Sequence, residues 1–207
     1  MKNEIKGYQI ETCMGKEDCP DSVVNHNGLA DKLEALLASY DIKGFLKKKI
    51  KGPLKFHHEF RISISDCPNA CSRPQIADIG FIGASVPTVA GDDCSQCMAC
   101  VEACKEGAVD LFSDNLPPAI YPENCLCCGQ CIRACAMDVI QEEKSGYRVL
   151  LGGRLGRHPQ LGRELEGIYS PEECIEIVKK CLKHFFSHYR EGERFGDIIN
   201  RTGINFL

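Results

Sequence analysis

Four cysteines near the beginning of the chain form two short pairs that could close around one metal cluster. Cys13 and Cys19 are separated by five residues, and Cys67 and Cys71 by three. Two such pairs, delivered from distant segments, can supply the four thiolates of one [4Fe-4S] cube. Cys71, the last of the four, can also face a second metal centre. The pattern therefore predicts a redox site at which catalysis can occur.

Eight further cysteines repeat one spacing twice. Both runs read C-x2-C-x2-C-x3-C, which is typical of a bacterial-type ferredoxin with two [4Fe-4S] clusters. In such a protein the fourth cysteine of each run binds the other cluster, so we predict that the two clusters are held crosswise. The first quartet is Cys94, Cys97, Cys100 and Cys135, and the second quartet is Cys125, Cys128, Cys131 and Cys104.

Disulfides and zinc are the main alternatives for a chain with 15 cysteines. A disulfide framework suits secreted proteins, but the N-terminal residues lack the apolar core of a signal peptide. Zinc takes four ligands in a tetrahedron, often with histidine, whereas these cysteines form interlocking sets at the iron–sulfur spacing. No apolar run approaches the roughly 18–20 residues that cross a bilayer. We therefore expect iron–sulfur clusters, no membrane partner and a cytoplasmic location.

The charged residues are unevenly distributed. The net charge is -4, but residues 92–143 hold ten acidic residues against two basic ones. Residues 43–61 have the opposite balance, with seven basic residues against one acidic residue. Because the chain as a whole is acidic, we expect no nucleic-acid partner.

The acidic stretch coincides with the repeated cysteine runs, which predicts a compact domain inserted into a longer host. The inserted ferredoxin domain is placed at residues 92–143, and the host at 1–91 and 144–207. Two aspartates follow Gly91 at one end, and residues 141–146 are mostly polar at the other. Both ends are therefore expected to be surface connections.

The host sequence predicts mixed α and β structure that supports the cysteine loops. Strands are predicted at 60–64, 76–83 and 147–151, and helices at 28–40 and 170–189. The first of these strands leads directly into Cys67, so this cysteine is expected just after a strand end. Ser170 begins a capping box with proline at the first helical position, which marks the start of the last helix.

Three cysteines stand outside the quartets. On the last predicted helix, Cys174 and Cys181 share an apolar face with Val178 and Phe185, which favours core packing over metal binding. Cys127, directly before Cys128, has no predicted role.

Several segments resemble the sirohaem-containing sulfite and nitrite reductases. Besides the two cysteine pairs, the resemblance rests on residues 60–74 (FRISISDCPNACSRP) and 79–83 (IGFIG). The inserted cysteine runs, residues 152–159 (GGRLGRHP) and residues 193–197 (ERFGD) are most similar to the dissimilatory and anaerobic sulfite reductase branch. The resemblance covers the chain but only the C-terminal half of the family's architecture. It implies an α+β half-domain, with a mixed sheet and helices on one face, that carries the inserted ferredoxin domain.

The resemblance also implies the cofactors. Cys13, Cys19, Cys67 and Cys71 would hold a further [4Fe-4S] cluster, and Cys71 would also be the axial ligand of a sirohaem iron. A shared sulfur would couple the two centres electronically, so that electrons pass singly to a bound oxyanion. The expected cofactors are therefore three [4Fe-4S] clusters and sirohaem.

Cationic residues in the family-like segments are candidates for the haem pocket. Sirohaem is rich in carboxylates, and guanidinium is the best planar partner for a carboxylate. The candidates are Arg61, Arg73, Arg154 and Arg157, of which Arg73 and Arg154 are favoured. Lys55 ends a lysine run that either serves haem or substrate or forms a solvated or docking face.

Two histidines follow the lysine run. His57 and His58 are an exposed pair at a strand entry in the simpler interpretation. Alternatively, His58 is a proton source, because reducing sulfite or nitrite consumes protons and histidine titrates near neutrality. The candidate catalytic residues are therefore Cys71, Arg73, His58 and Lys55.

The predicted function is the six-electron reduction of sulfite to sulfide, fed by a low-potential electron donor protein that docks at the inserted domain. Reduction of nitrite to ammonia is the alternative for the same site. A non-catalytic electron-transfer subunit and a haem-binding sensor are further possibilities. Because the resemblance lacks half of the family's site, we expect a second copy of the chain or a partner subunit to complete it.

Overall fold

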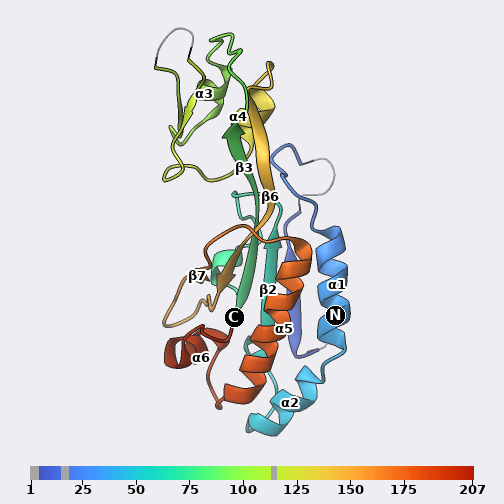
Figure 1. Cartoon of the computed structure of the whole chain (residues 1–207). Helices are drawn as coiled ribbons and strands as arrows, with labels where there is room; N and C mark the ends of the chain where they lie inside the picture. Colours follow the sequence, from blue (N-terminus) through green and yellow to red (C-terminus); the bar gives the residue numbers. More distant parts are fainter. Residues whose placement is uncertain (1–4, 15–18, 113–115) are drawn as a thin grey trace.

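The computed structural model describes residues 5–14, 19–112 and 116–207. Its centre is a mixed sheet of five strands in the order β1-β2-β3-β6-β7 (Figure 1). The strands are β1 (Tyr8–Thr12), β2 (Phe60–Ser65), β3 (Ile79–Val89), β6 (Ile140–Leu151) and β7 (Arg163–Glu164). β1, β2 and β3 run parallel, whereas β6 is antiparallel to both β3 and β7. The predicted α+β class with a mixed sheet is therefore confirmed.

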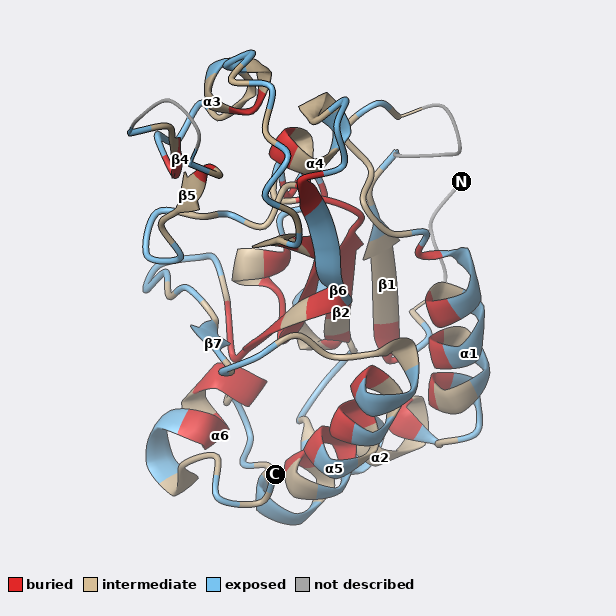
Figure 2. Cartoon of the chain, turned by 45° about the horizontal axis from the view of Figure 1, so that its top comes forward, coloured by how far each residue is buried: buried red, intermediate tan, exposed pale blue. Residues whose placement is uncertain are grey.

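Helices cover one face of this sheet. They are α1 (Asn27–Ala38), α2 (Ile42–Lys49), α5 (Pro171–His188) and α6 (Phe195–Thr202). Two short 3-10 turns, η1 (Phe56–His58) and η2 (Pro74–Ile76), precede β2 and β3. The buried sides of α1 and α5 face the strands in Figure 2. Alternate residues of β2, namely Phe60, Ile62 and Ile64, are fully buried in the same core as these helices. Burial of this apolar face fixes the register of β2.

β3 and β6 continue beyond the other strands as a long antiparallel hairpin that carries a small second unit at its far end (Figure 1). This unit contains α3 (Ala99–Ala103), β4 (Val109–Asp110), β5 (Ala119–Ile120) and α4 (Gln130–Ala134). It has its own small core, in which Cys100 and Cys131 pack with Val109 and Ile140. None of the helices in the described residues is long and apolar enough to cross a membrane.

Most elements predicted from the pattern are present, but one predicted surface connection is strand. The capping box is confirmed, because the Ser170 N–H donates to Glu173 (2.7 Å) and the Glu173 N–H donates to Ser170 (3.2 Å). Cys174 and Cys181 lie fully buried in the main core, which confirms the packing role. Residues 141–146 were expected to be a surface connection, but they are strand. They pair with β3 while their side chains stay exposed, so no apolar alternation marks them.

Candidate metal centre

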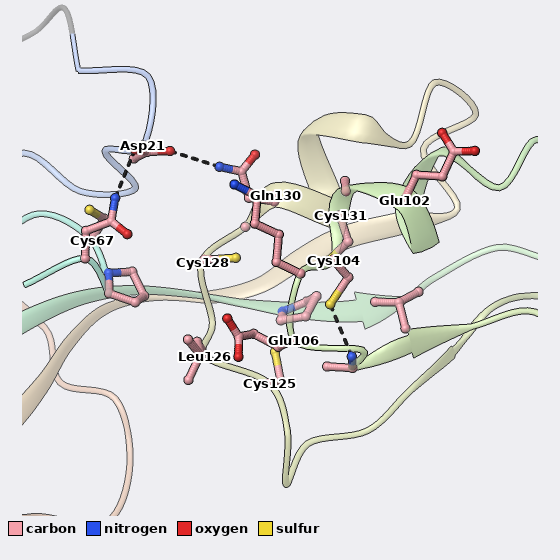
Figure 3. A pocket seen from close by; sticks show the side chains of 18 residues that line it. Asp21, Cys67, Glu102, Cys104, Glu106, Cys125, Leu126, Cys128, Gln130 and Cys131 are labelled. Carbon is pink, nitrogen blue, oxygen red and sulfur yellow. Dashed lines mark hydrogen bonds between the residues drawn. The ribbon is translucent and has the colours of Figure 1, made fainter.

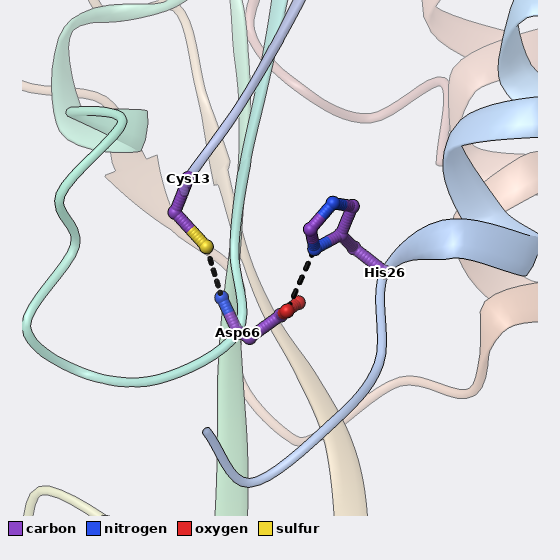
Figure 4. A group of neighbouring side chains, drawn as sticks. All are labelled: Cys13, His26 and Asp66. Atoms are coloured by element: carbon purple, nitrogen blue, oxygen red, sulfur yellow. Dashed lines mark hydrogen bonds and ion pairs between the residues drawn. The ribbon is translucent and has the colours of Figure 1, made fainter. Parts of the chain in front are cut away.

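The ends of two parallel strands bring three of the first four cysteines to one edge of the sheet. Cys13 follows β1, and its N–H donates to the carbonyl of Ile64 at the end of β2 (2.9 Å). Cys67 and Cys71 lie in the loop that follows β2. The N–H of Asp66 donates to the Cys13 sulfur at 3.4 Å (Figure 4). The Cys13 thiol therefore lies against the residue that immediately precedes Cys67.

Cys67 is surrounded by other groups that carry negative charge. Burial raises the pKa of its thiol, and the neighbouring Cys19, Asp21 and Cys71 raise it further, against a backbone hydrogen bond from Asn69 that lowers it. These groups therefore lie close enough together to interact electrostatically. None of the described residues that shift the pKa of Cys67 is a cation. A bound metal cluster supplies positive charge, so the donor set fits an iron–sulfur centre.

The loop from Cys67 to Cys71 is held on the open face of β2 by backbone turns and hydroxyl groups. Ala70 and Arg73 adopt left-handed conformations, with φ of 51° and 60°. Ser72, between Cys71 and Arg73, donates its hydroxyl to the carbonyl of Ile64 (2.8 Å). These contacts fix Cys71, which is exposed, on the side of the sheet opposite the helices.

Two glycines of the family-like segment 79–83 let other backbone segments pack directly on β3. A Cβ atom on Gly80 would lie 2.2 Å from the carbonyl oxygen of Pro74 in η2. A Cβ atom on Gly83 would lie 2.3 Å from the carbonyl oxygen of Asp66. Neither distance is compatible with a side chain, so only glycine allows the cysteine loop to sit this close to the strand.

The small second unit repeats one backbone geometry twice. Left-handed residues occur 31 positions apart, at Gln96 and Cys127, at Met98 and Gly129, and at Gly107 and Asp138. The short helices α3 and α4 are offset by the same interval. The two cysteine runs therefore have the same local conformation as well as the same spacing.

Two cavities of the second unit are lined by cysteines from both runs. One is lined by the first quartet, Cys94, Cys97, Cys100 and Cys135. The other is lined by the second quartet, Cys104, Cys125, Cys128 and Cys131, together with Cys67 (Figure 3). The fourth cysteine of each run thus joins the cavity of the other run, as the crosswise prediction requires.

The pKa shifts reflect the same grouping. Burial raises the pKa of Cys131 to about 11, and Cys125, Cys128 and Cys104 contribute to the increase. Burial also raises the pKa of Cys100, with contributions from Cys135 and Cys94. Ionisation of Cys131 and Cys100 is therefore disfavoured in the protein alone, and bound iron would supply positive charge that favours their thiolates.

Backbone N–H groups point at the fourth cysteine of each run. The N–H of Ala108 donates to the Cys104 sulfur at 3.2 Å, and the N–H of Ile140 donates to the Cys135 sulfur at 3.5 Å. Hydrogen bonds of this kind stabilise thiolates and tune the potential of a cluster. Cys127 lines neither cavity, but its N–H donates to the Cys125 sulfur at 3.4 Å, a backbone contact that Cys127→Ser would keep. Its carbonyl accepts a hydrogen bond from the N–H of Ser85 on β3 (2.8 Å).

The four candidate arginines differ in how many hydrogen bonds and ion pairs their guanidinium groups make with the described residues. Arg154 forms an ion pair with Asp197 and donates to the carbonyl of His158 (3.0 Å). The Nε of Arg61 is buried and has no hydrogen-bond partner in the described structure. Arg73 and Arg157 are exposed, and their guanidinium groups make no hydrogen bonds with the described residues. Arg61 lies at the amino end of β2, where its Nη2 donates to the Phe56 carbonyl (3.5 Å), so only Arg73, two residues after Cys71, is placed next to the cysteine loop by the chain itself.

His58 and Lys55 are not brought to the cysteine loop. They lie in and beside η1, at the amino end of β2, whereas Cys67 and Cys71 follow its carboxyl end. Six strand residues separate the two ends by roughly 20 Å. The N–H of Lys55 donates to Nδ1 of His58 (3.0 Å), and the rings of His57 and His58 are in contact. This geometry favours the simpler interpretation of a histidine pair at the strand entry.

A buried pair next to Cys13 was not identified from the sequence. Nδ1 of His26 lies 2.6 Å from a carboxylate oxygen of Asp66, and both side chains are almost completely buried. Cys13, His26 and Asp66 form a compact group (Figure 4). A lone histidine 40 residues from its partner carries no spacing signal, so only the tertiary structure reveals the pair.

The arrangement of these thiols agrees with the comparison to known families. The family model described as "Nitrite and sulphite reductase 4Fe-4S domain" matches residues 6–207. The chain belongs to this family. Membership in this nitrite and sulfite reductase family implies an iron–sulfur cluster, and the resemblance stated from the sequence is confirmed.

Relatives of this reductase-family chain share similar sequences over part of their length. A subunit of the anaerobic sulfite reductase of Salmonella typhimurium is 32% identical over 90% of this chain and 50% of that protein. A coenzyme F420-dependent sulfite reductase of Methanocaldococcus jannaschii is 32% identical over 70% of this chain and 23% of that protein. The crystal structure of dissimilatory sulfite reductase I has the same fold, with a TM-score of 0.62 and 17% identity over 94% of this chain and 49% of that one. The chain thus spans half or less of the length of these relatives.

Proposed function

We propose that this chain is a sulfite reductase that uses sirohaem and three [4Fe-4S] clusters to reduce sulfite to sulfide with six electrons. The observation that carries the proposal is the succession of three thiol groups through the molecule. Cys100 and Cys131, one from each quartet, pack in the same small core, and Cys67 lines the cavity of the second quartet. Successive clusters at these positions would adjoin one another, which suits stepwise electron transfer.

In this proposal, electrons enter at the first quartet. Cys97 is exposed, and Met98 and Met137, which line the same cavity, are exposed by 41% and 52%. Exposed large apolar side chains beside a redox centre suit a contact surface for another protein. The acidic character of residues 92–143 favours a low-potential donor protein with a basic surface. The inserted two-cluster ferredoxin domain at 92–143 is part of this proposal.

Sirohaem is proposed to lie against the open face of the sheet, next to Cys71. When bound, it would supply an iron centre that passes electrons to the sulfur of sulfite, whose oxygen atoms would leave as water after protonation. Cys71 is exposed and so can reach a second centre, while Arg73 and Arg157 offer positive charge for carboxylates of the macrocycle or for the oxyanion. Arg61 lies at the other end of β2, beside η1, and is not proposed to act next to Cys71. Arg154 is proposed to act indirectly, because Asp197 already holds it.

Two other functions remain specific alternatives. Nitrite reduction to ammonia uses the same kind of site and the same number of electrons. A non-catalytic electron-transfer role is also compatible with the succession of three thiol groups, because these groups alone can hold clusters that carry electrons without a haem. If the chain is the reductase, we propose that a second copy of the chain or a partner subunit completes the haem site.

Anaerobically purified protein tests the proposal directly. Iron and acid-labile sulfide should correspond to three clusters, and the haem absorption should change on addition of sulfite. The variant Cys71→Ser should lose sulfite-dependent turnover and the coupling of haem to its cluster, while the two quartets keep their iron. The matched control is Cys127→Ser, which removes a thiol that lines neither cavity and should keep full activity.

The possible outcomes separate the three functions. Sulfite turnover by the parent and its loss in Cys71→Ser support the sulfite reductase, whereas preference for nitrite supports the first alternative. Iron–sulfur absorption without haem supports the electron-transfer role. Full activity of Cys71→Ser contradicts the proposed role of this cysteine.

A further inference from the structure

One carboxylate joins the three segments that carry the proposed inner clusters. Oδ2 of Asp21 accepts a hydrogen bond from the side-chain amide of Asn69 (2.9 Å), and Oδ1 accepts one from the side-chain amide of Gln130 (3.1 Å). Both bonds are visible in Figure 3, where Asp21 lies between the Cys67 loop and α4. The two bonds bridge 48 and 109 positions of sequence, so neither is a local turn contact.

Each of the three residues stands among predicted cluster ligands. Asp21 follows Cys19 by two positions, and Asn69 lies between Cys67 and Cys71. Gln130 lies between Cys128 and Cys131 and is the first residue of α4. The Asp21 carboxylate therefore connects the loop of the proposed haem-coupled cluster directly to the loop of the second quartet.

The backbone around Asp21 is packed between the two units as well. Val23 and Val24 both donate their N–H groups to the carbonyl of Asp66 (3.0 and 3.3 Å). On the other side, a Cβ atom on Gly129 would meet Val23 at 3.4 Å and Ser85 at 3.3 Å. The segment 19–24 thus fills the junction between the large sheet and the small second unit.

We infer that Asp21 is a positioning residue that fixes the distance and orientation between the cluster of the second quartet and the cluster held by Cys13, Cys19, Cys67 and Cys71. This inference rests on the proposed function. Asp21 holds both cluster-binding loops through one rigid planar group, whereas the hydrogen bond from the Ser85 N–H to the Cys127 carbonyl ties the second unit to β3 and does not involve the Cys67 loop. Without the carboxylate, the second unit moves on the hairpin and the transfer of electrons across the junction slows.

The test uses the full chain with its clusters and compares Asp21→Ala with Glu106→Ala. Glu106 lines the same cavity and is exposed, but it makes no hydrogen bond or ion pair with the described residues. The control therefore removes a nearby negative charge without removing the bridge. Loss of two hydrogen bonds should speed amide hydrogen exchange in residues 19–24 and 128–134 by about tenfold or more.

Two cluster-dependent measurements complete the test. In Asp21→Ala, the magnetic interaction between reduced clusters should weaken, and reduction of the haem-coupled cluster by a donor should slow, at unchanged iron content. Glu106→Ala should match the parent in both. The inference is overturned if Asp21→Ala behaves like Glu106→Ala in exchange and in cluster coupling.

Two substitutions that each remove one of the hydrogen bonds keep the test decisive if Asp21→Ala loses iron. Gln130→Ala removes only the bond to the second unit, and Asn69→Ala removes only the bond to the Cys67 loop. Each should speed amide hydrogen exchange by less than Asp21→Ala does. Gln130→Ala should cause no further increase in exchange when Asp21 is already alanine. Unchanged exchange in both single variants overturns the inference. Absence of clusters from the parent contradicts the proposed function instead, while the exchange experiment still reports on the bridge.

Discussion

Gly83 offers a stringent test of how the cysteine loop is positioned. The substitution Gly83→Ala adds one methyl group on β3, directly against the backbone of Asp66. The new Cβ atom would lie 2.3 Å from the Asp66 carbonyl oxygen and 2.5 Å from its carbonyl carbon. Ordinary contact needs about 3.5 Å, so the two segments must separate locally by about 1 Å.

The cost follows from what that movement disturbs. The same carbonyl accepts hydrogen bonds from Val23 and Val24, and Asp66 precedes Cys67. Overpacking of this kind costs about 1–3 kcal/mol of folding free energy. For a chain of 207 residues this corresponds to a decrease in melting temperature of about 2–12 °C. We also expect incomplete loading of the cluster held by Cys67.

Thermal unfolding and iron analysis of the parent, Gly83→Ala and a control variant provide the measurement. Gly28→Ala is the matched control, because Gly28 lies in α1 and a Cβ atom there meets nothing within 4 Å. In the control, the helix should gain about 0.4–1 kcal/mol. A Gly83→Ala protein with the melting temperature and iron content of the parent would refute the reasoning.

Three further predictions concern the host domain. Ser170→Ala removes the capping box of α5 and should cost about 1 kcal/mol, measured as a lower melting temperature, whereas Ser187→Ala on the exposed side of α5 should change little. Burial raises the pKa of Cys174 to about 12 and also raises the pKa of Cys181, so neither thiol should react with iodoacetamide until the protein unfolds, as judged by mass spectrometry. Burial, His57, Lys55 and Arg194 lower the pKa of His58 below 6.5. Because the unfolded chain binds this proton more readily than the folded protein, the contribution of neutral His58 to the free energy of unfolding is present above pH 6.5 and is lost as the pH falls through the lowered pKa. His58→Gln removes this titration, so its melting temperature should fall less below pH 6.5 than that of the parent.

Local signals predicted local structure well. The capping box at Ser170 and the helical periodicity of 28–40 both depend on interactions between residues a few positions apart. The helices that they predicted, α5 and α1, are therefore present in the folded chain. The strand 141–146 was missed because its side chains are exposed, and pairing with β3 depends on a partner far along the chain. Helices α2 and α6 were also not predicted. Each has only eight residues, which is too short for a clear periodicity, and their apolar residues are recognised as one face only when they pack in the main core.

The site residues also divide into those with a local sequence signal and those whose partners lie far along the chain. Spacing predicted the twelve cysteines of the proposed clusters, whereas Lys55 was a candidate as the end of a lysine run and His58 as a proton source that titrates near neutrality. In the structure they lie at the far end of β2 from Cys71. Asp21 and the pair of His26 and Asp66 carry no motif, since their partners come from distant segments.

The sequence by itself determined which residue types can bind metal and how each cysteine run is shaped, because short spacings restrict the backbone directly. Only the tertiary structure decided that Cys67 adjoins the second quartet and that one carboxylate bridges the two loops. Those relations depend on strand register and on the packing of glycines against distant backbone. Such contacts form only when the whole apolar core is buried, and no local pattern encodes them.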